Sequence, residues 1–182
     1  MKLLICSDIH GDINGAEKIA EIFKKEKCDK IILLGDILYH GPRNDLPEGY
    51  DPKAVISLLN SMKGDIVAVR GNCDTEVDQM VLEFPILSDY SYVLTDGLTL
   101  FLTHGHNFNE DNLPPLLSSG DVIVHGHTHV LQATEIGKGI YYVNPGSVSI
   151  PKGGNPKTYA IYENRNFTIY DFDGGEVEHA VV

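Results

Sequence analysis

Residues 122–129 read Val-Ile-Val-His-Gly-His-Thr-His, and this segment decides how the rest of the chain is interpreted. An apolar run typical of a buried strand ends abruptly in three histidines, His125, His127 and His129. Alternate side chains leave the same side of an extended backbone, so these imidazoles point in a common direction. A single histidine is often an ordinary core or surface residue, but three so close together indicate a metal site.

The chain before this segment alternates strands and helices. Asn14 with Glu17 resembles a capping box at the start of one helix, and Pro52 suits the first position of another. Such alternation favours a largely parallel sheet. Strands are predicted at 2–7, 30–34 and 65–69.

The second half is predicted to consist of short strands. Asp96-Gly97 is a hairpin signal, and a short helix is expected near 110–117. Two sheets packed face to face, with helices outside, accommodate both halves of the chain. The strands expected in this half lie at 92–94, 98–103, 132–136, 140–143, 159–162, 167–172 and 176–181.

Composition limits the class of protein. A chain of 182 residues with 42% hydrophobic and 22% charged residues fits one globular domain, 1–182. The net charge of −12 disfavours long DNA or RNA as a partner, because nucleic-acid binding relies on Lys and Arg. We find neither a signal peptide nor an apolar run of about 20 residues, and we expect a cytoplasmic protein that does not enter the membrane.

The cysteines indicate neither a disulfide framework nor a thiolate zinc site. Cys6, Cys28 and Cys73 are odd in number and form no CxxC pair. The oligomeric state stays open, a homo-oligomer included.

Ligand-type side chains follow several predicted strands, usually next to a glycine. Together they offer two carboxylates, four imidazoles and one amide oxygen, which exceeds the needs of one ion but suits two ions that share a bridging carboxylate. Mixed nitrogen and oxygen donors favour first-row transition metals. We expect two divalent ions, manganese first, with nickel, iron or zinc as alternatives. The candidate ligands are Asp8, His10, Asp36, Asn72, His104, His127 and His129.

These motifs resemble those of a known family. Asp8-x-His10, Gly35-Asp36, Gly71-Asn72, His104 and Gly126-His127-x-His129 occur in the order found in calcineurin-like metallophosphoesterases. Segments 40–44, 71–74 and 144–156 are similar to those of the bacterial YfcE-type phosphodiesterases. The resemblance implies an α/β fold, a four-layer α/β/β/α sandwich of two mixed β-sheets flanked by helices.

The resemblance also implies roles for the candidate ligands. Asp36 would bridge the two ions. Asp8, His10 and His129 would hold the first ion, and Asn72, His104 and His127 the second.

A phosphodiesterase reaction follows from the same resemblance. A hydroxide that bridges the ions would attack a small phosphodiester in line, without a covalent enzyme intermediate. Two divalent ions carry four positive charges, and two carboxylates and the hydroxide remove three, which leaves one to meet a monoanionic diester.

Cys73 departs from the common family pattern. Many relatives place a histidine directly after the motif asparagine, where it can protonate the leaving group, and a thiol is a weaker donor. We expect slow reaction of poor leaving groups, unless His106, His40 or water supplies the proton, and a preference for diesters over monoesters. The alternative is that Cys73 is only a small buried residue.

Five further positions each have two interpretations. Arg43 can clamp a phosphate oxygen as a catalytic residue or be a solvated loop residue, and Lys152 has a weaker claim to the same role. His106 and His125 can orient metal ligands or be ordinary loop histidines. Asp74 is expected to cap the helix that follows it rather than to support the ligands.

Two rival functions remain. The retromer scaffold subunit has a similar fold with degraded metal chemistry, so the chain could be a protein-interaction scaffold, although seven intact ligands argue against it. A nuclease is the other alternative, and the acidic charge disfavours it. The physiological substrate cannot be identified from the sequence, because no base-recognition motif stands out.

Overall fold

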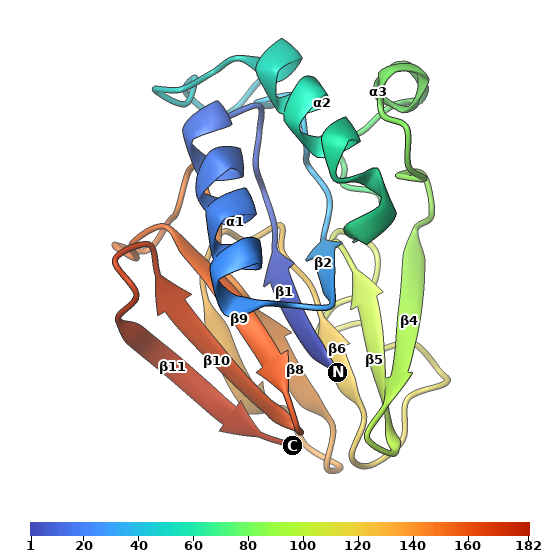
Figure 1. Cartoon of the computed structure of the whole chain (residues 1–182). Coiled ribbons are helices and arrows are strands. Elements are labelled where there is room, and N and C mark those ends of the chain that lie inside the picture. The colour runs from blue at the N-terminus through green and yellow to red at the C-terminus, as the bar shows by residue number, and fades with distance from the viewer.

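The computed structural model describes residues 1–182 and contains two mixed β-sheets packed face to face, with helices over the outer face of one (Figure 1). The first sheet is made of β1 (Lys2–Cys6), β2 (Lys30–Leu33), β3 (Ile66–Ala68), β9 (Thr158–Glu163), β10 (Asn166–Asp171) and β11 (Glu176–Val181). Their spatial order is β11-β10-β9-β1-β2-β3. The β1, β2 and β3 strands are parallel, as predicted, and the other three pair antiparallel.

The second sheet has five strands. They are β4 (Tyr90–Thr95), β5 (Leu98–Thr103), β6 (Val122–Val124), β7 (Gln132–Glu135) and β8 (Tyr141–Asn144), in the order β4-β5-β6-β8-β7. The hairpin predicted at Asp96-Gly97 joins β4 to β5, and both of its turn residues have positive φ angles of 52° and 77°. The strands therefore lie within one or two residues of almost every predicted range, and the predicted fold class is confirmed.

Strand periodicity divides the core between two faces of the first sheet. Leu4 and Cys6 point toward the helices, while Leu3 and Ile5 point toward the second sheet and pack with residues such as Val124. All of these side chains are fully buried. Because β1 is packed on both faces of the first sheet, its end is held in a fixed position relative to the strands of the second sheet.

Three α-helices accompany the sheets, α1 (Ile13–Glu26), α2 (Pro52–Ser61) and α3 (Glu76–Val81), with a 3₁₀ turn at Lys63–Asp65. The predicted capping box of α1 is wrong: Asp12 is the N-cap, and its side chain accepts the N–H of Asn14 at 3.0 Å. Its carboxylate lies before the first turn and reaches that amide, whereas Asn14 is already inside the helix. The α2 helix starts with Pro52 at its first position, as predicted.

The predicted helix near 110–117 is also wrong, because the segment is an irregular loop. Pro114 and Pro115 provide no amide hydrogen and crowd the preceding turn, which breaks a helix there. The loop instead packs Phe108, Leu113 and Leu117 against the outer face of the second sheet. This face is therefore covered by a loop rather than by a helix. No helix of the chain combines the length and the apolar character needed to cross a membrane.

Candidate metal centre

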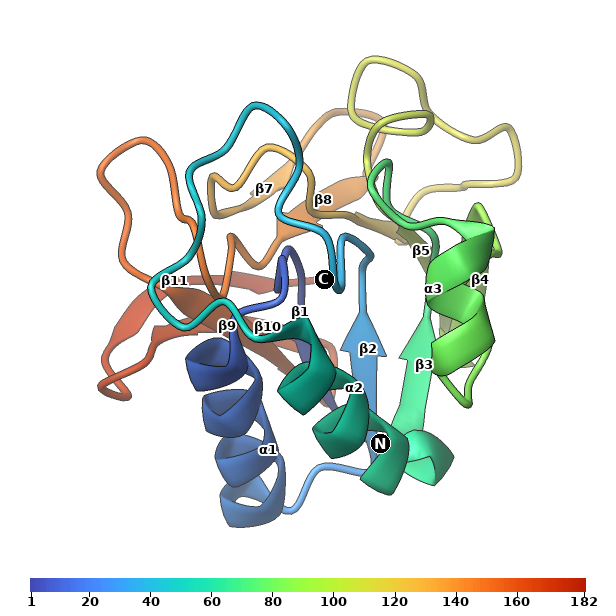
Figure 2. The same ribbon diagram turned by 90° about the horizontal axis from the view of Figure 1, so that it is seen from above.

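All seven candidate ligands lie just beyond the carboxyl ends of strands. Asp8 and His10 follow β1, and Asp36 follows β2, while Asn72 comes shortly after β3. His104 follows β5, and His127 and His129 follow β6 in the second sheet. Parallel strands deliver their following residues to one edge, so the two sheets bring these loops together at the same end of the molecule (Figure 2).

Asp8, His10 and His129 form one group. The Nε2 atoms of His10 and His129 lie 3.4 Å apart, and Asp8 Oδ1 is 3.5 Å and 3.2 Å from them. All three side chains are buried. One carboxylate oxygen and two imidazole nitrogens therefore converge at a single point.

Asn72, His104 and His127 form a second group. His104 Nε2 lies 3.0 Å from Asn72 Oδ1 and 3.2 Å from His127 Nδ1. His127 thus faces this point with its Nδ1 atom, unlike the other histidines.

Asp36 lies between the two groups. Its Oδ2 atom is 3.7 Å from His10 Nε2 and 3.5 Å from His104 Nε2, while Oδ1 accepts the N–H of Cys73 at 2.8 Å. One oxygen of Asp36 therefore faces both groups, as a bridging ligand would.

Backbone carbonyls fix the orientation of three imidazoles. The Nδ1 atoms of His10, His104 and His129 each lie 2.7 Å from a carbonyl oxygen, of Tyr39, Leu34 and Ile150 respectively. Because each Nδ1–H donates to a carbonyl, each Nε2 keeps its lone pair for the centre. This arrangement is common around metal-ligating histidines.

Five of the seven candidates have left-handed backbone conformations, namely Asp8, His10, Asp36, His127 and His129, with φ angles between 49° and 68°. Non-glycine residues rarely adopt this region, and each such residue costs about 1 kcal/mol or more. Strain concentrated on the very residues that converge indicates a functional constraint.

The donor set fits a metal. Asp8 Oδ1 is buried without any hydrogen-bond partner, whereas Oδ2 accepts the N–H of His127 at 3.0 Å. A buried carboxylate oxygen without a partner is costly, and a cation at the first group would satisfy it. The hydroxyls of Ser147 and Ser149 both donate to the carbonyl oxygen of Asp8, at 2.9 Å and 2.8 Å, and so hold the backbone of this residue.

Asp74 has a different role from the helix cap expected from the sequence. Its carboxylate accepts the backbone N–H groups of Asp36, Ile37 and Gly71 at 2.8–2.9 Å. The cap of α3 is Thr75, which forms a capping box with Asp78. Asp74 therefore clamps the loop that carries Asp36 to the loop that carries Asn72, and the cap prediction is wrong.

Electrostatics favour positive charge at the centre. Burial alone raises the pKa of Asp8, but its contacts with His10 and His129 hold that pKa well below its ordinary value. Burial lowers the pKa of His104, yet Asp36 and Asp8 raise it to about 9. Burial and the charge of His104 lower the pKa of His127 to about 4. The two carboxylates thus attract a cation to this place.

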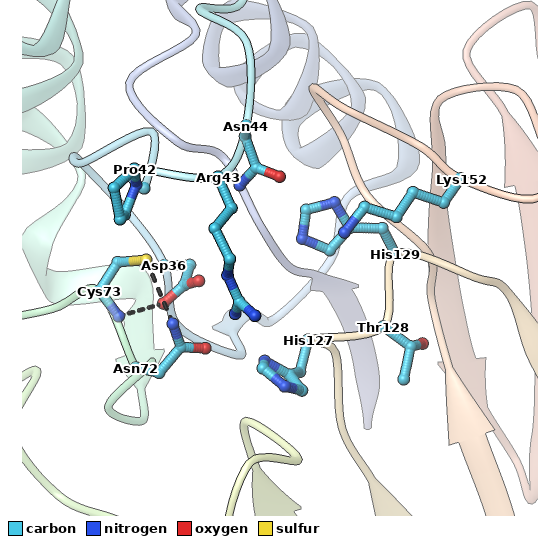
Figure 3. Close-up of a pocket in the computed structure, with 11 residues that line it drawn as sticks. Asp36, Pro42, Arg43, Asn44, Asn72, Cys73, His127, Thr128, His129 and Lys152 are labelled. Carbon is cyan, nitrogen blue, oxygen red and sulfur yellow. Dashed lines mark hydrogen bonds between the residues drawn. The ribbon is translucent and has the colours of Figure 1, made fainter.

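A pocket of about 430 Å³ opens over Asp36, Asn72 and the histidines of the second sheet. The Arg43 side chain extends into it toward Asp36 and Asn72, and Lys152 reaches in from the opposite wall (Figure 3). Cys73 lines the pocket as well, and Asn72 Nδ2 lies 3.3 Å from its sulfur. Burial and the nearby Asp36 raise the pKa of the Cys73 thiol to about 12, so the thiol stays neutral.

His125 and His106 lie beside the centre rather than in it. His125 is buried and its Nε2 lies 3.0 Å from Glu110 Oε2, a partner that the sequence did not indicate. His106 packs against the rings of His104 and His127, with centroids 5.4 Å and 6.2 Å away.

Sequence reasoning also missed the supporting residues Ser147 and Ser149, and for Asp74 it favoured the helix cap over the supporting role. The Asn-Pro-Gly-Ser-Val-Ser run at 144–149 was a signal for the first two, since a turn-rich run with two serines can present hydroxyls to a neighbouring carbonyl.

Comparisons with known proteins agree with this geometry. A family model described as the calcineurin-like phosphoesterase superfamily domain matches residues 1–166. The chain is 51% identical over 164 residues to phosphodiesterase YfcE of Escherichia coli K12, covering 90% of this chain and 88% of that protein. It is 30% identical over 154 residues to phosphodiesterase MJ0936 of Methanocaldococcus jannaschii, covering 80% and 83%.

Solved structures give the same picture. The structure of YfcE, described as a phosphoesterase from Escherichia coli, superposes with a TM-score of 0.97 at 47% identity, over 100% of this chain and 99% of that one. Vacuolar protein sorting 29 of Cryptosporidium parvum superposes with a TM-score of 0.64 over 100% of this chain and 98% of that one. Its identity of 16% indicates a common fold alone.

Proposed function

The chain belongs to the calcineurin-like phosphoesterase superfamily and is an enzyme of that family, and we propose that it hydrolyses small phosphodiesters with two bound metal ions. The observation that carries the proposal is the position of Asp36 Oδ2, which faces His10 on one side and His104 on the other. A single ion would not need donors on both sides of this oxygen.

We assign the donors as two sets that share Asp36. Asp8, His10 and His129 would hold the first ion, and Asn72, His104 and His127 the second. Manganese is the proposed metal, with nickel, iron or zinc as alternatives, because imidazole and carboxylate donors suit first-row ions. When bound, two such ions supply a hydroxide near neutral pH for in-line attack and stabilise charge on the phosphoryl oxygens.

Residues of the chain itself would bind and orient the phosphate. Arg43 enters the pocket toward Asp36 and Asn72 and offers a planar guanidinium, which suits two phosphoryl oxygens. The pocket volume of about 430 Å³ fits a small ligand. The net charge of −12 disfavours a long polyanion, which argues against the nuclease alternative.

With Cys73 at this position, no effective general acid would lie beside the leaving group to protonate it. Its thiol is a weak donor, and its pKa of about 12 is far above neutral pH. Good leaving groups would therefore react fastest. A monoanionic diester would also bind against Asp36 and Asp8 with less repulsion than a dianionic monoester.

The scaffold alternative receives less support. The likeness to vacuolar protein sorting 29 concerns the fold, whereas the seven donors of this chain converge with fixed imidazole orientations. We further propose a cytoplasmic location, which the free thiols of Cys6, Cys28 and Cys73 support.

The test is metal removal with a chelator, followed by reconstitution with Mn, Ni, Fe, Zn or Mg. We expect hydrolysis of p-nitrophenyl phosphodiesters to disappear and return, with little activity on matched monoesters. Asp36→Asn should lose activity, and Asp45→Asn, an exposed acid in the following loop, should keep it. Metal binding without hydrolysis of any diester would refute the proposal in favour of the scaffold.

A further inference from the structure

A second hollow lies between α2 and α3, beside the metal centre, and we call it the α2–α3 groove. It has a volume of about 340 Å³, and seven of its 11 lining residues are hydrophobic. The pocket over the metal centre has one hydrophobic residue among 11. The two hollows therefore offer different chemistry to a ligand.

Cys73 joins the groove to the metal centre. It lines both hollows, and its Sγ atom lies within 4.8 Å of ligand atoms of His10 and Asp36. Tyr39 forms another link, because its side chain lines the groove while its carbonyl oxygen accepts the Nδ1–H of His10 at 2.7 Å. An ester arm of a phosphate bound at the centre would therefore reach the end of the groove.

The groove leaves apolar side chains in water. Val77 is 68% exposed, Val81 43% and Tyr39 42%. Apolar side chains gathered in one hollow are typical of a ligand-binding surface, whereas scattered ones need no explanation. Burial of these side chains by a ligand would be favourable.

We propose that the α2–α3 groove binds an apolar ester arm of the substrate, so that the preferred substrates are phosphodiesters with one alkyl or aryl arm. The phosphate lies at the metal centre, an inference that rests on the proposed function. The apolar arm passes the neutral thiol of Cys73 and enters the groove. The other arm stays in the polar pocket with Arg43 and Lys152.

Alkyl methyl phosphates test this assignment as competitive inhibitors of p-nitrophenyl diester hydrolysis. Their alkoxides are poor leaving groups, so they act as inhibitors and their arm length can be varied from methyl to hexyl. Each methylene that enters the groove should lower Ki by up to about fourfold, the factor that corresponds to about 0.8 kcal/mol per buried CH₂.

Val77→Asp places a charge in the groove without breaking α3. Position 77 lies in the first turn of the helix, where acidic residues are favoured. The variant should lose most of the dependence of Ki on arm length. Met80→Asp is the control, because Met80 is 83% exposed on the same helix and does not line the groove.

Methyl NMR of the protein loaded with zinc, which is diamagnetic, gives a readout that does not depend on catalysis. Hexyl methyl phosphate should shift the methyl resonances of Ile56 and Val81, and dimethyl phosphate should not. A Ki independent of arm length, or an unchanged dependence in Val77→Asp, overturns the assignment, as does the absence of these shifts. Failure of the proposed function is distinguishable, because no metal would then restore hydrolysis of any diester.

Discussion

Gly71 is the position where one added methyl group should disable the centre. An ideal Cβ at this residue would lie 2.1 Å from Asp36 Oδ1 and 2.2 Å from the Asp36 backbone nitrogen. Real Cβ contacts stay at or above 3.0 Å, so the two loops must separate by at least about 0.9 Å in Gly71→Ala.

Neither loop can move freely to make this room. Asp36 Oδ1 accepts the N–H of Cys73, and Asp74 binds the N–H groups of both Asp36 and Gly71. A shift of about 1 Å at a catalytic group typically costs about a hundredfold in rate, and disturbed supporting contacts cost about 10–100-fold in metal affinity. We therefore expect Gly71→Ala to lose about two orders of magnitude in kcat/KM, with weaker metal binding.

The assay is kcat/KM on a p-nitrophenyl diester, together with metal content after dialysis. Gly64→Ala is the matched control, because no atom lies within 4 Å of its added Cβ. Circular dichroism should show that both variants are folded. If Gly71→Ala keeps more than half of the activity and its full metal content, the reasoning about close backbone approach is wrong.

Three further predictions concern neighbouring groups. Asp74→Asn replaces a carboxylate that accepts three N–H groups by an amide, and metal affinity in a dialysis titration should fall about tenfold or more; an unchanged affinity would contradict the clamp. Cys73→His should raise kcat/KM about a hundredfold for alkyl leaving groups and little for p-nitrophenyl, and no gain would refute the missing acid. Burial lowers the pKa of His104 but Asp36 and Asp8 raise it to about 9, so a proton competes with metal below that pH. Manganese affinity, measured by calorimetry, should therefore rise by up to about tenfold per pH unit from about 7 to 9 and then level off, and a flat profile would exclude this competition.

The strands and the candidate ligands could be predicted because both depend on local sequence. An apolar run that stops at Gly35-Asp36 or at Gly126-His127 shows the strand, its end and the donor together. The parallel arrangement then brings strand ends to one edge. The prediction of Asp74 as a cap failed for the opposite reason, since its partners at Asp36 and Ile37 lie more than 35 positions away.

The loop at 105–121 and the α2–α3 groove show the same limit. Leu113 and Leu117 have helical spacing, but the adjacent prolines and the apolar face of the second sheet favour a loop that packs both side chains. The groove combines residues of α2, α3 and the segment after β2, so no single window of sequence indicates it. Tertiary placement decides both features.

The strained candidate ligands persist because the loops that carry them are hydrogen-bonded to one another through the backbone. The N–H of Asp8 donates to Gly35 O at 3.2 Å, that of His10 to Asp36 O at 2.9 Å, and that of Gly126 to His104 O at 3.0 Å. These bonds join the ends of β1 and β2 in one sheet and of β5 and β6 in the other, so left-handed residues are held by neighbours rather than by their own preference. Loss of one donor side chain removes one candidate ligand and leaves the backbone hydrogen bonds between the loops in place. A side chain added at Gly71 instead pushes against the Asp36 loop, one of the loops that these bonds hold together. The two kinds of substitution should therefore differ in how many donors they displace, even when both abolish activity.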